Sequence, residues 1–316
     1  MCTAIYDNRG GACLGRTLDV ECEYMQSVLT VPEGTRQITT HKGKIKYRFA
    51  VVGAGINMGG TPLLFDGVNS AGLAGCALSF PLAEYSDKPR GVLSLSSFEV
   101  LSYALARFSS IGDIVTAFSE LTVTSTSPDG LAPTPLHWIF ADKTSAVVLE
   151  YSNGKARIYQ NPFGVMSNAP GFAYHKYNAE RIMGLSPRQP RDNLLSGDIK
   201  PCSRGIGAVG LPGDFSSPSR FLRALFCLKN SDVGEWNISR TFHTLGAVSV
   251  PRGAVEADGG KTHTSYTSVM DIESGAYYFT TYTNPAISAV RLKNDAECKQ
   301  MCAYSMQTPQ NINLLN

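Results

Sequence analysis

The chain has 316 residues, of which 43% are hydrophobic and 17% charged, a composition that is typical of a folded globular protein and excludes intrinsic disorder. The 28 Lys and Arg nearly balance the 26 Asp and Glu, and a net charge of +2 without a basic run argues against nucleic-acid binding. No apolar run is long enough to cross a membrane and no signal-peptide pattern is present, so we expect a cytoplasmic protein if Met1 is the true start.

The predicted elements are mostly strands. Residues 2–7 and 12–18 are expected to pair as adjacent strands around a turn at 8–11. Further strands are predicted at 48–52, 73–80, 136–141, 146–151, 156–160 and 276–283, with turns at Asp66-Gly67, Ala71-Gly72 and Asn153-Gly154. Helical patterning predicts helices at 97–108, at 113–121 with Ser110 as its cap, at 221–228 and at 238–245. Residues 184–219, rich in Pro, Gly and Ser, are predicted to form a long irregular excursion from a single domain.

The eight cysteines are scattered along a chain too long to need disulfides, which indicates reduced thiols. Neither they nor the five histidines have the paired spacing of a zinc site, and we expect no metal. Two glycine clusters imitate nucleotide motifs, at Gly205–Gly210 and at Gly53–Gly55. The first lacks a preceding strand and is followed by Pro212, and the second lacks its third glycine, so no nucleotide cofactor is predicted.

Cys2 is the residue with the clearest chemical potential. Removal of Met1 would leave it with a nucleophilic thiol and a free α-amine, whose ordinary pKa of about 7.7–8.0 suits a general base at neutral pH. One residue could then supply a complete nucleophile–base pair. Arg16 and Asp19 return beside Cys2 if the two N-terminal strands pair, where a carboxylate could orient the amine and an arginine could favour the thiolate. The alternatives are a buried thiol and a structural ion pair.

Several short motifs occur in one order along the chain. They are Met1-Cys2-Thr3, Gly15–Asp19, Leu78–Pro81, Leu136–Trp138, Gly164–Pro170 and Leu211–Phe221, and Phe242–Gly246 continues the series. In this order they closely resemble the choloylglycine hydrolase family, which includes bile salt hydrolases and penicillin V acylases. The resemblance covers nearly the whole chain, and it implies an α+β fold, a four-layer αββα sandwich of two antiparallel sheets flanked by helices, as in N-terminal-nucleophile hydrolases.

The resemblance also implies roles for six catalytic residues. Cys2 would be the nucleophile with its own amine as the base, Asp19 would hold that amine, and Arg16 would support the thiolate. Asn168 would donate its side-chain amide to the oxyanion and Arg220 would complete the polar floor. Ser79 stands where bile salt hydrolases carry asparagine and penicillin V acylases often carry tyrosine, and its main-chain N–H would still be an oxyanion donor. Thr17 is a second departure, at a position where bile salt hydrolases usually carry asparagine.

The same resemblance implies an apolar substrate wall and a function. The wall would comprise Leu18, Tyr24, Met58, Phe65 and Leu131, for which core packing is the alternative explanation. We expect a cysteine amidohydrolase that cleaves glycine- or taurine-conjugated bile salts, without a cofactor, in a homotetramer. The alternatives are a penicillin V acylase, a hydrolase of other N-acyl amides, and a binding protein that keeps the fold without catalysis. Glutamine amidotransferases also begin with Cys2, but usually follow it with glycine where Thr3 stands here.

Overall fold

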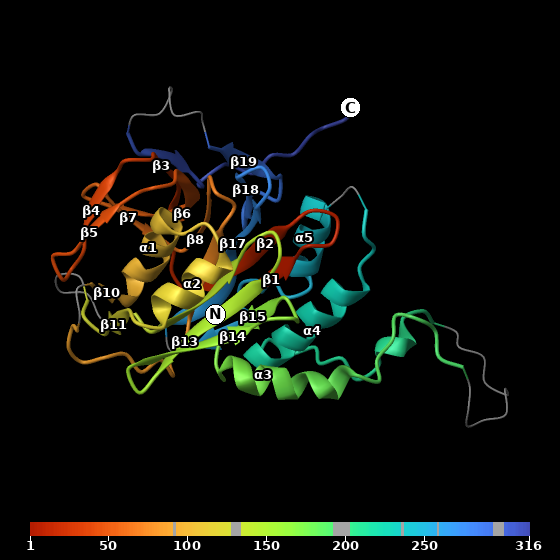
Figure 1. Cartoon of the computed structure of the whole chain (residues 1–316). Helices are drawn as coiled ribbons and strands as arrows, with labels where there is room; N and C mark the ends of the chain where they lie inside the picture. The colour runs from red at the N-terminus through yellow and green to blue at the C-terminus, as the bar shows by residue number, and fades with distance from the viewer. Residues whose placement is uncertain (91–92, 128–133, 192–202, 235–236, 258, 293–299) are drawn as a thin grey trace.

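A computed structural model describes residues 1–90, 93–127, 134–191, 203–234, 237–257, 259–292 and 300–316. Two large antiparallel sheets form its centre (Figure 1). The seven-stranded sheet has the order β15 (Val165–Ser167), β1 (Cys2–Asp7), β2 (Cys13–Val20), β17 (Gly260–Asp271), β18 (Ala276–Thr281) and β19 (Ser288–Arg291), with β16 (Val255–Ala257) paired to β17. The first strand of the chain is therefore an interior strand of this sheet.

The second sheet has nine strands and includes the predicted strands 136–141, 146–151 and 156–160. Its order is β14 (Lys155–Gln160), β13 (Ala146–Ser152), β12 (Leu136–Ala141), β9 (Ala74–Ser79), β8 (Asp66–Asn69), β6 (Val51–Met58), β3 (Ser27–Val31) and β20 (Cys302–Ser305), with β7 (Thr61–Leu64) paired to β6. Two small pairs lie outside it: β4 (Arg36–Ile38) with β5 (Lys44–Lys46), and β10 (Ser94–Ser96) parallel to β11 (Thr122–Thr124).

Helices cover the outer face of each sheet. Helices α1 (Val100–Arg107) and α2 (Ile111–Phe118) pack on the nine-stranded sheet, whereas α4 (Ser217–Asn230) and α5 (Asn237–Gly246) pack on the seven-stranded sheet and α3 (Phe172–Asn178) packs on α4. Three 3-10 turns, η1 (Ser97–Glu99), η2 (Ala179–Ile182) and η3 (Ile206–Ala208), complete the elements. The predicted four-layer αββα sandwich is confirmed. Among the described residues, no helix is long and apolar enough to cross a membrane.

Most predicted elements are present with shifted ends. Helix α2 begins at Ile111, two residues before the prediction, because Ser110 and Asp113 form a capping box. Helix α4 begins at Ser217, so the predicted irregular stretch 184–219 overlaps its first turn. The turn predicted at Asp66-Gly67 is wrong, since both residues lie inside strand β8. Helix α3 and strand β17 were not predicted from the sequence.

The glycines near residue 53 serve strand packing. Gly53 and Gly55 lie inside β6, and a Cβ on Gly53 would come within 2.1 Å of the Asp66 carbonyl oxygen. A side chain there would therefore force β6 and β8 apart. This close approach explains why these glycines lie in a strand.

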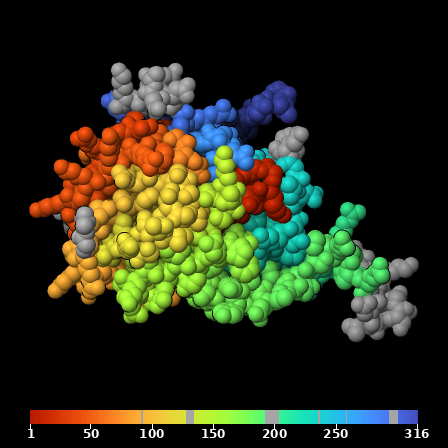
Figure 2. Space-filling view, viewed as in Figure 1, coloured from red at the N-terminus to blue at the C-terminus, as the bar shows by residue number. Residues whose placement is uncertain are grey.

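A hydrophobic core fills the space between the two sheets, and a second core lies between the nine-stranded sheet and helices α1 and α2. Cys2 belongs to the first core, together with its strand neighbour Leu18. The described part of the stretch between α3 and α4 instead projects from the body of the molecule (Figure 2). The sandwich thus places the N-terminus in a packed interior and leaves one segment standing out from it.

Candidate active site

Cys2 begins strand β1 and is 4% exposed. The predicted pairing of the two N-terminal strands is observed: Cys2 lies opposite Leu18, and β15 pairs with the other edge of β1. On β2, Arg16 points to the same face of the sheet as Cys2 because side chains alternate along a strand. Its Nη2 donates a hydrogen bond to Cys2 Sγ over 2.8 Å. The hairpin alone therefore brings a guanidinium onto the sulfur.

Arg16 is itself held from the opposite sheet. Its Nη1 donates to the Phe65 carbonyl oxygen over 3.3 Å and lies 3.4 Å from Asp66 Oδ2. Burial alone would lower the pKa of Arg16, but the negative charges at Cys2 and Asp66 more than offset it, and the pKa lies well above its ordinary value. Arg16 is therefore a buried cation aimed at the sulfur of Cys2.

Asp66 anchors this cation, and the sequence did not single it out. The hydroxyl of Tyr266 donates to Asp66 Oδ2 over 2.5 Å and the hydroxyl of Tyr277 to Oδ1 over 2.6 Å. Burial, followed by the charge of Asp66, raises the pKa of both tyrosines well above the ordinary value, so both hydroxyls keep their protons and remain donors. The strand-forming run of Thr, Ser, Tyr and Val at 262–270 was the signal that could have located Tyr266.

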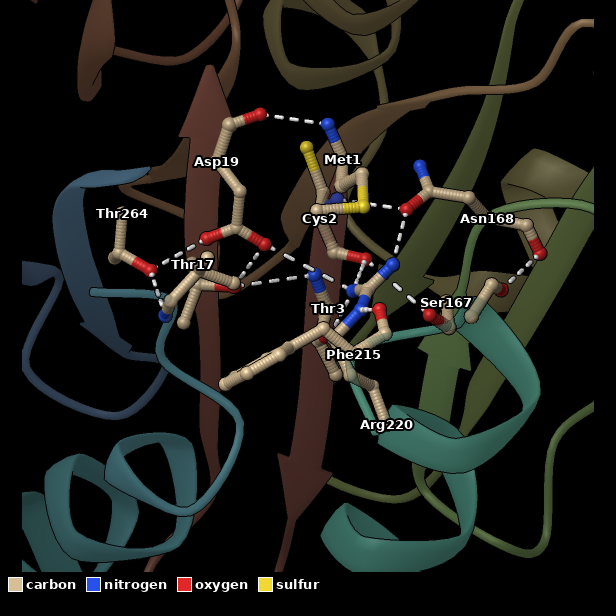
Figure 3. Close-up of polar contacts among 12 residues, drawn as sticks. Met1, Cys2, Thr3, Thr17, Asp19, Ser167, Asn168, Phe215, Arg220 and Thr264 are labelled. Carbon is tan, nitrogen blue, oxygen red and sulfur yellow. Dashed lines mark hydrogen bonds and ion pairs between the residues drawn. The ribbon is translucent and has the colours of Figure 1, made fainter. Parts of the chain in front are cut away.

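Asp19 lies on the opposite face of β2 from Arg16, toward the helices (Figure 3). Thr264 Oγ1 donates to its Oδ1 over 2.7 Å and Thr17 Oγ1 to its Oδ2 over 3.3 Å. The departure at Thr17 therefore places a hydroxyl on Asp19. In this structure Met1 precedes Cys2, so Cys2 N is a peptide nitrogen, and it is the main chain of Asp19 that pairs with Met1.

Arg220, on α4, links these groups from the helix side of the sheet. Its Nη1 donates to the Cys2 carbonyl oxygen over 2.6 Å and to Thr3 Oγ1 over 2.5 Å, and it lies 3.8 Å from Asp19 Oδ2. Its Nη2 donates to Asn168 Oδ1 over 2.8 Å. Burial lowers the pKa of Arg220, with the charges of Asp19 and Cys2 opposing the shift.

Asn168 completes the ring of contacts around Cys2 (Figure 3). Cys2 N donates to its Oδ1 over 2.7 Å, and its Nδ2 donates to the Ser79 carbonyl oxygen over 2.8 Å. An amide nitrogen has two hydrogens, so one donor of Asn168 Nδ2 is left for a ligand oxygen. Ser79 ends strand β9 and is exposed, and the structure thus places its main chain at the mouth of the site.

The residues expected to line the substrate wall divide into three groups. Leu18 lies beside Cys2, and Phe65 reaches the site through its carbonyl and packs edge-to-face on Tyr24 at 5.6 Å. Met58 lies at the exposed end of β6, and the described contacts do not join it to Cys2. Leu131 lies outside the described residues.

The arrangement offers the parts that acyl transfer to sulfur needs. It has a thiol under a buried cation, and a side chain, Asn168, that binds the nitrogen of the same residue and has an amide donor beside it. A family model described as linear amide C–N hydrolases, choloylglycine hydrolase family, matches residues 2–304. The chain belongs to the choloylglycine hydrolase family. The likeness noted in the motifs is thereby confirmed, and the protein is a hydrolase of linear amide C–N bonds.

Relatives within this family differ in how much of their sequence is identical to this chain. The bile salt hydrolase/transferase of Lactiplantibacillus plantarum is 31% identical over 98% of both chains. A crystal structure of a mutant conjugated bile acid hydrolase from Clostridium perfringens matches with a TM-score of 0.93, at 30% identity over 100% of both chains. The penicillin V acylase of Pectobacterium atrosepticum is 26% identical over 78% of this chain and 67% of that protein.

A buried histidine beneath this choloylglycine hydrolase-family site gives a pH dependence. His175 Nε2–H donates to the Asn168 carbonyl oxygen over 2.9 Å, and burial lowers the pKa of His175 below its ordinary 6.5. The unfolded chain then binds more protons than the native state below about pH 6.5, so stability is full above that pH and falls below it, by up to about 1.4 kcal/mol per pH unit.

The check is urea unfolding at about pH 7 and about pH 5. His175→Gln is expected to lose less of its free energy of unfolding on acidification than the unsubstituted protein does. His243 is exposed, and His243→Gln is the matched control with an unaltered pH slope. If His175→Gln and the unsubstituted protein lost equal free energy of unfolding on acidification, His175 would bind its proton equally in the folded and unfolded states.

Proposed function

We propose that this protein cleaves the amide bond of glycine- or taurine-conjugated bile salts, releasing a free bile acid and the amino acid. The observation that carries the proposal is the contact of the buried Arg16 guanidinium with Cys2 Sγ, within the ring formed by Asn168 and Arg220. Two further facts support it: relatives named as bile salt or conjugated bile acid hydrolases match over the full length, and Leu18 and Phe65 offer apolar surface beside the sulfur.

The proposed reaction starts with removal of Met1, which turns Cys2 N from a peptide nitrogen into an amine. That amine accepts the thiol proton, and Asn168 Oδ1, now 2.7 Å from this nitrogen, and Asp19 help to hold it. The sulfur, favoured as a thiolate by Arg16, attacks the amide carbonyl. The free donor of Asn168 Nδ2 and the Ser79 main-chain N–H receive the oxyanion. The amine returns its proton to the leaving nitrogen, and water then hydrolyses the thioester by the same steps.

The test of the substrate class is a panel of kcat/KM values for glycocholate, taurocholate and penicillin V. The proposal expects the two conjugated bile salts to be preferred. A clear preference for penicillin V would overturn it in favour of the penicillin V acylase alternative, for which Ser79 is the residue to examine because its side chain is exposed at the mouth of the site. Activity on none of the three would favour other N-acyl amides.

Loss of the oxyanion donor at residue 168 gives a rate prediction. Asn168→Leu keeps the approximate size of the side chain but has no N–H, and we expect kcat to fall by about 10²–10³-fold. Ser79→Ala is the contrasting variant, because its main-chain N–H is kept, and its loss should be far smaller. Steady-state kinetics on the best substrate of the panel give both values. Equal losses in the two variants would contradict these donor assignments.

The proposal treats residues 1–316 as one amidohydrolase domain that works without Met1. The continuous match of the family model over residues 2–304 supports a single domain. Intact-protein and N-terminal peptide mass spectrometry should find Cys2 as the first residue. Full activity of a protein that retains Met1 would refute the role of the Cys2 amine as the base.

The proposal also includes a cytoplasmic homotetramer assembled through residues 184–219. Reduced thiols at Cys2, Cys13, Cys22, Cys76 and Cys227 agree with a reducing compartment. Val209 of the projecting segment is apolar and 74% exposed, as a partner contact would require. Light scattering should give four times the monomer mass, and Val209→Glu should shift it to smaller species. A monomeric unsubstituted protein would refute this part of the proposal.

A further inference from the structure

A cavity of about 480 Å³ lies beside the seven-stranded sheet, next to the end of β2 that carries Asp19 and Val20. The residues that line it come from the segment after β2, from β17 and β18, and from the C-terminal segment: Glu23, Met25, Gln26, Arg252, His263, Ser265, Thr281, Tyr282, Thr283, Met306, Gln307, Thr308 and Pro309. The volume is in the range of small-molecule sites. None of the described residues that contact Cys2 is among those lining it.

One wall of the cavity is a set of polar groups locked by hydrogen bonds around Glu23. The carboxylate accepts from Ser265 Oγ at 2.6 Å, from Gln26 Nε2 at 3.2 Å and from His263 Nε2 at 3.0 Å. Burial raises the pKa of Glu23, but these hydrogen bonds together lower it by more, so the pKa lies below its ordinary value. Glu23 therefore places a negative charge on this wall.

The groups around Glu23 hold its carboxylate in place. Gln26 Nε2 and His263 Nε2 both donate to it, because a carboxylate only accepts. Gln26 and His263 are 7% and 4% exposed, whereas the Glu23 side chain is 44% exposed. The wall therefore presents a fixed carboxylate that remains open to a donor on a ligand.

The cavity also has a cationic side. Arg252 lines it and is exposed, so its guanidinium is available to an anion. Arg252 N donates to Tyr282 Oη over 3.2 Å, which leaves the Tyr282 hydroxyl hydrogen free to donate. The Tyr282 ring stands edge-on to His263 at 5.0 Å, which joins the two sides. The cavity therefore presents the negatively charged carboxylate of Glu23 on one wall and the positively charged Arg252, with the Tyr282 hydroxyl, on the other.

We propose that this cavity is a binding site for a small zwitterion that carries an ammonium group and a carboxylate or sulfonate, such as a free amino acid. The ammonium would donate to the exposed Glu23 carboxylate. The acidic group would bind Arg252 and the Tyr282 hydroxyl. The inference does not depend on which amide Cys2 cleaves.

The site has a direct connection to the catalytic one through residues 21–26. Tyr24 of this segment packs on Phe65, whose carbonyl oxygen binds Arg16, while its neighbours Glu23 and Gln26 form the cavity wall. A ligand that fixes Glu23 also fixes the backbone next to Tyr24. Occupancy should therefore alter the wall beside Cys2.

Isothermal titration calorimetry of the full chain with glycine, taurine, methylammonium and acetate tests the proposal. Glycine or taurine should bind saturably, and at least about tenfold more tightly than methylammonium or acetate, because each half-ligand loses one charge-assisted contact set. Arg252→Gln and Glu23→Gln should each weaken binding of the zwitterion by about tenfold or more. Arg36→Gln, at an exposed position on β4, is the charge-matched control and should bind like the unsubstituted protein.

The outcomes separate cleanly. No saturable heat up to about 100 mM zwitterion would overturn the proposal, since that affinity is close to no binding. Equal affinity in Arg252→Gln, which changes an exposed side chain and leaves the core intact, would place the ligand elsewhere, the catalytic site included. Methylammonium binding as tightly as glycine would reduce the site to one for simple cations and would refute the zwitterion assignment.

Discussion

Replacing Cys2 by serine is expected to lower kcat/KM for amide hydrolysis by about 10⁴-fold or more, the scale of loss seen when a nucleophile is removed from other hydrolases. A serine hydroxyl has a far higher pKa than a thiol, so the Arg16 guanidinium that lies 2.8 Å from the sulfur would not generate an alkoxide. The variant should fold, because the exchange is nearly isosteric and the backbone contacts of residue 2 with Asn168 and Arg220 are kept.

Cys227→Ser is the matched control for this variant. Cys227 lies on α4, the helix that also carries Arg220, and it is a free thiol outside the contacts of Cys2. The Cys227→Ser protein should have the same kcat/KM for amide hydrolysis as the unsubstituted protein. Steady-state kinetics on a conjugated bile salt, with circular dichroism to verify the fold, give the comparison. Residual activity in Cys2→Ser within tenfold of the unsubstituted protein would remove Cys2 from the nucleophile role.

Neutralising Asp66 is expected to cost about 3–5 kcal/mol of unfolding free energy, because Asp66→Asn leaves the Arg16 cation buried without its counterion. Both side chains are fully buried, so water cannot replace the lost charge. Catalysis should fall as well, since Arg16 would lose the anchor that aims it at Cys2. Guanidinium or urea unfolding measures the stability, and the pH profile of kcat/KM reports the effect on the thiol.

Tyr277→Phe separates the charge from the hydrogen bonds around it. It removes one donor to Asp66 and keeps both charges, so its cost should be smaller, about 1.5–3 kcal/mol. An Asp66→Asn protein as stable as Tyr277→Phe, with an unaltered pH profile, would show that Arg16 is not held as a cation by Asp66.

Local signals in the sequence predicted the parts of the site that local structure builds. The hairpin at 8–11 fixes the register of Cys2 against residues 16–19, so the approach of Arg16 to Cys2 could be predicted from alternation alone. The resemblance then indicated Asn168 and Arg220, which the structure brings into contact with each other and with Cys2.

The anchoring of Arg16 could not be predicted in the same way. Asp66 precedes a glycine and reads as a turn, whereas its function depends on the packing of two sheets and on tyrosines 200 and 211 positions further along the chain. No local pattern contains a contact made across a sandwich. The same limit applies to α3. Its first residue, Phe172, donates its main-chain N–H to the carboxylate of Glu150 on the distant strand β13.

The interior position of β1 has a consequence for how the protein is made. Strand β1 is flanked by β2 and β15, and the polar partners of Cys2 extend to Arg220, with Thr264 behind Asp19. Cys2 therefore reaches its full set of contacts only when more than two hundred further residues have been made. Such long-range contacts also make folding slow relative to helical proteins. An early part of the chain is thus among the last to reach its working surroundings, and hydrolytic activity reports completion of the whole sandwich.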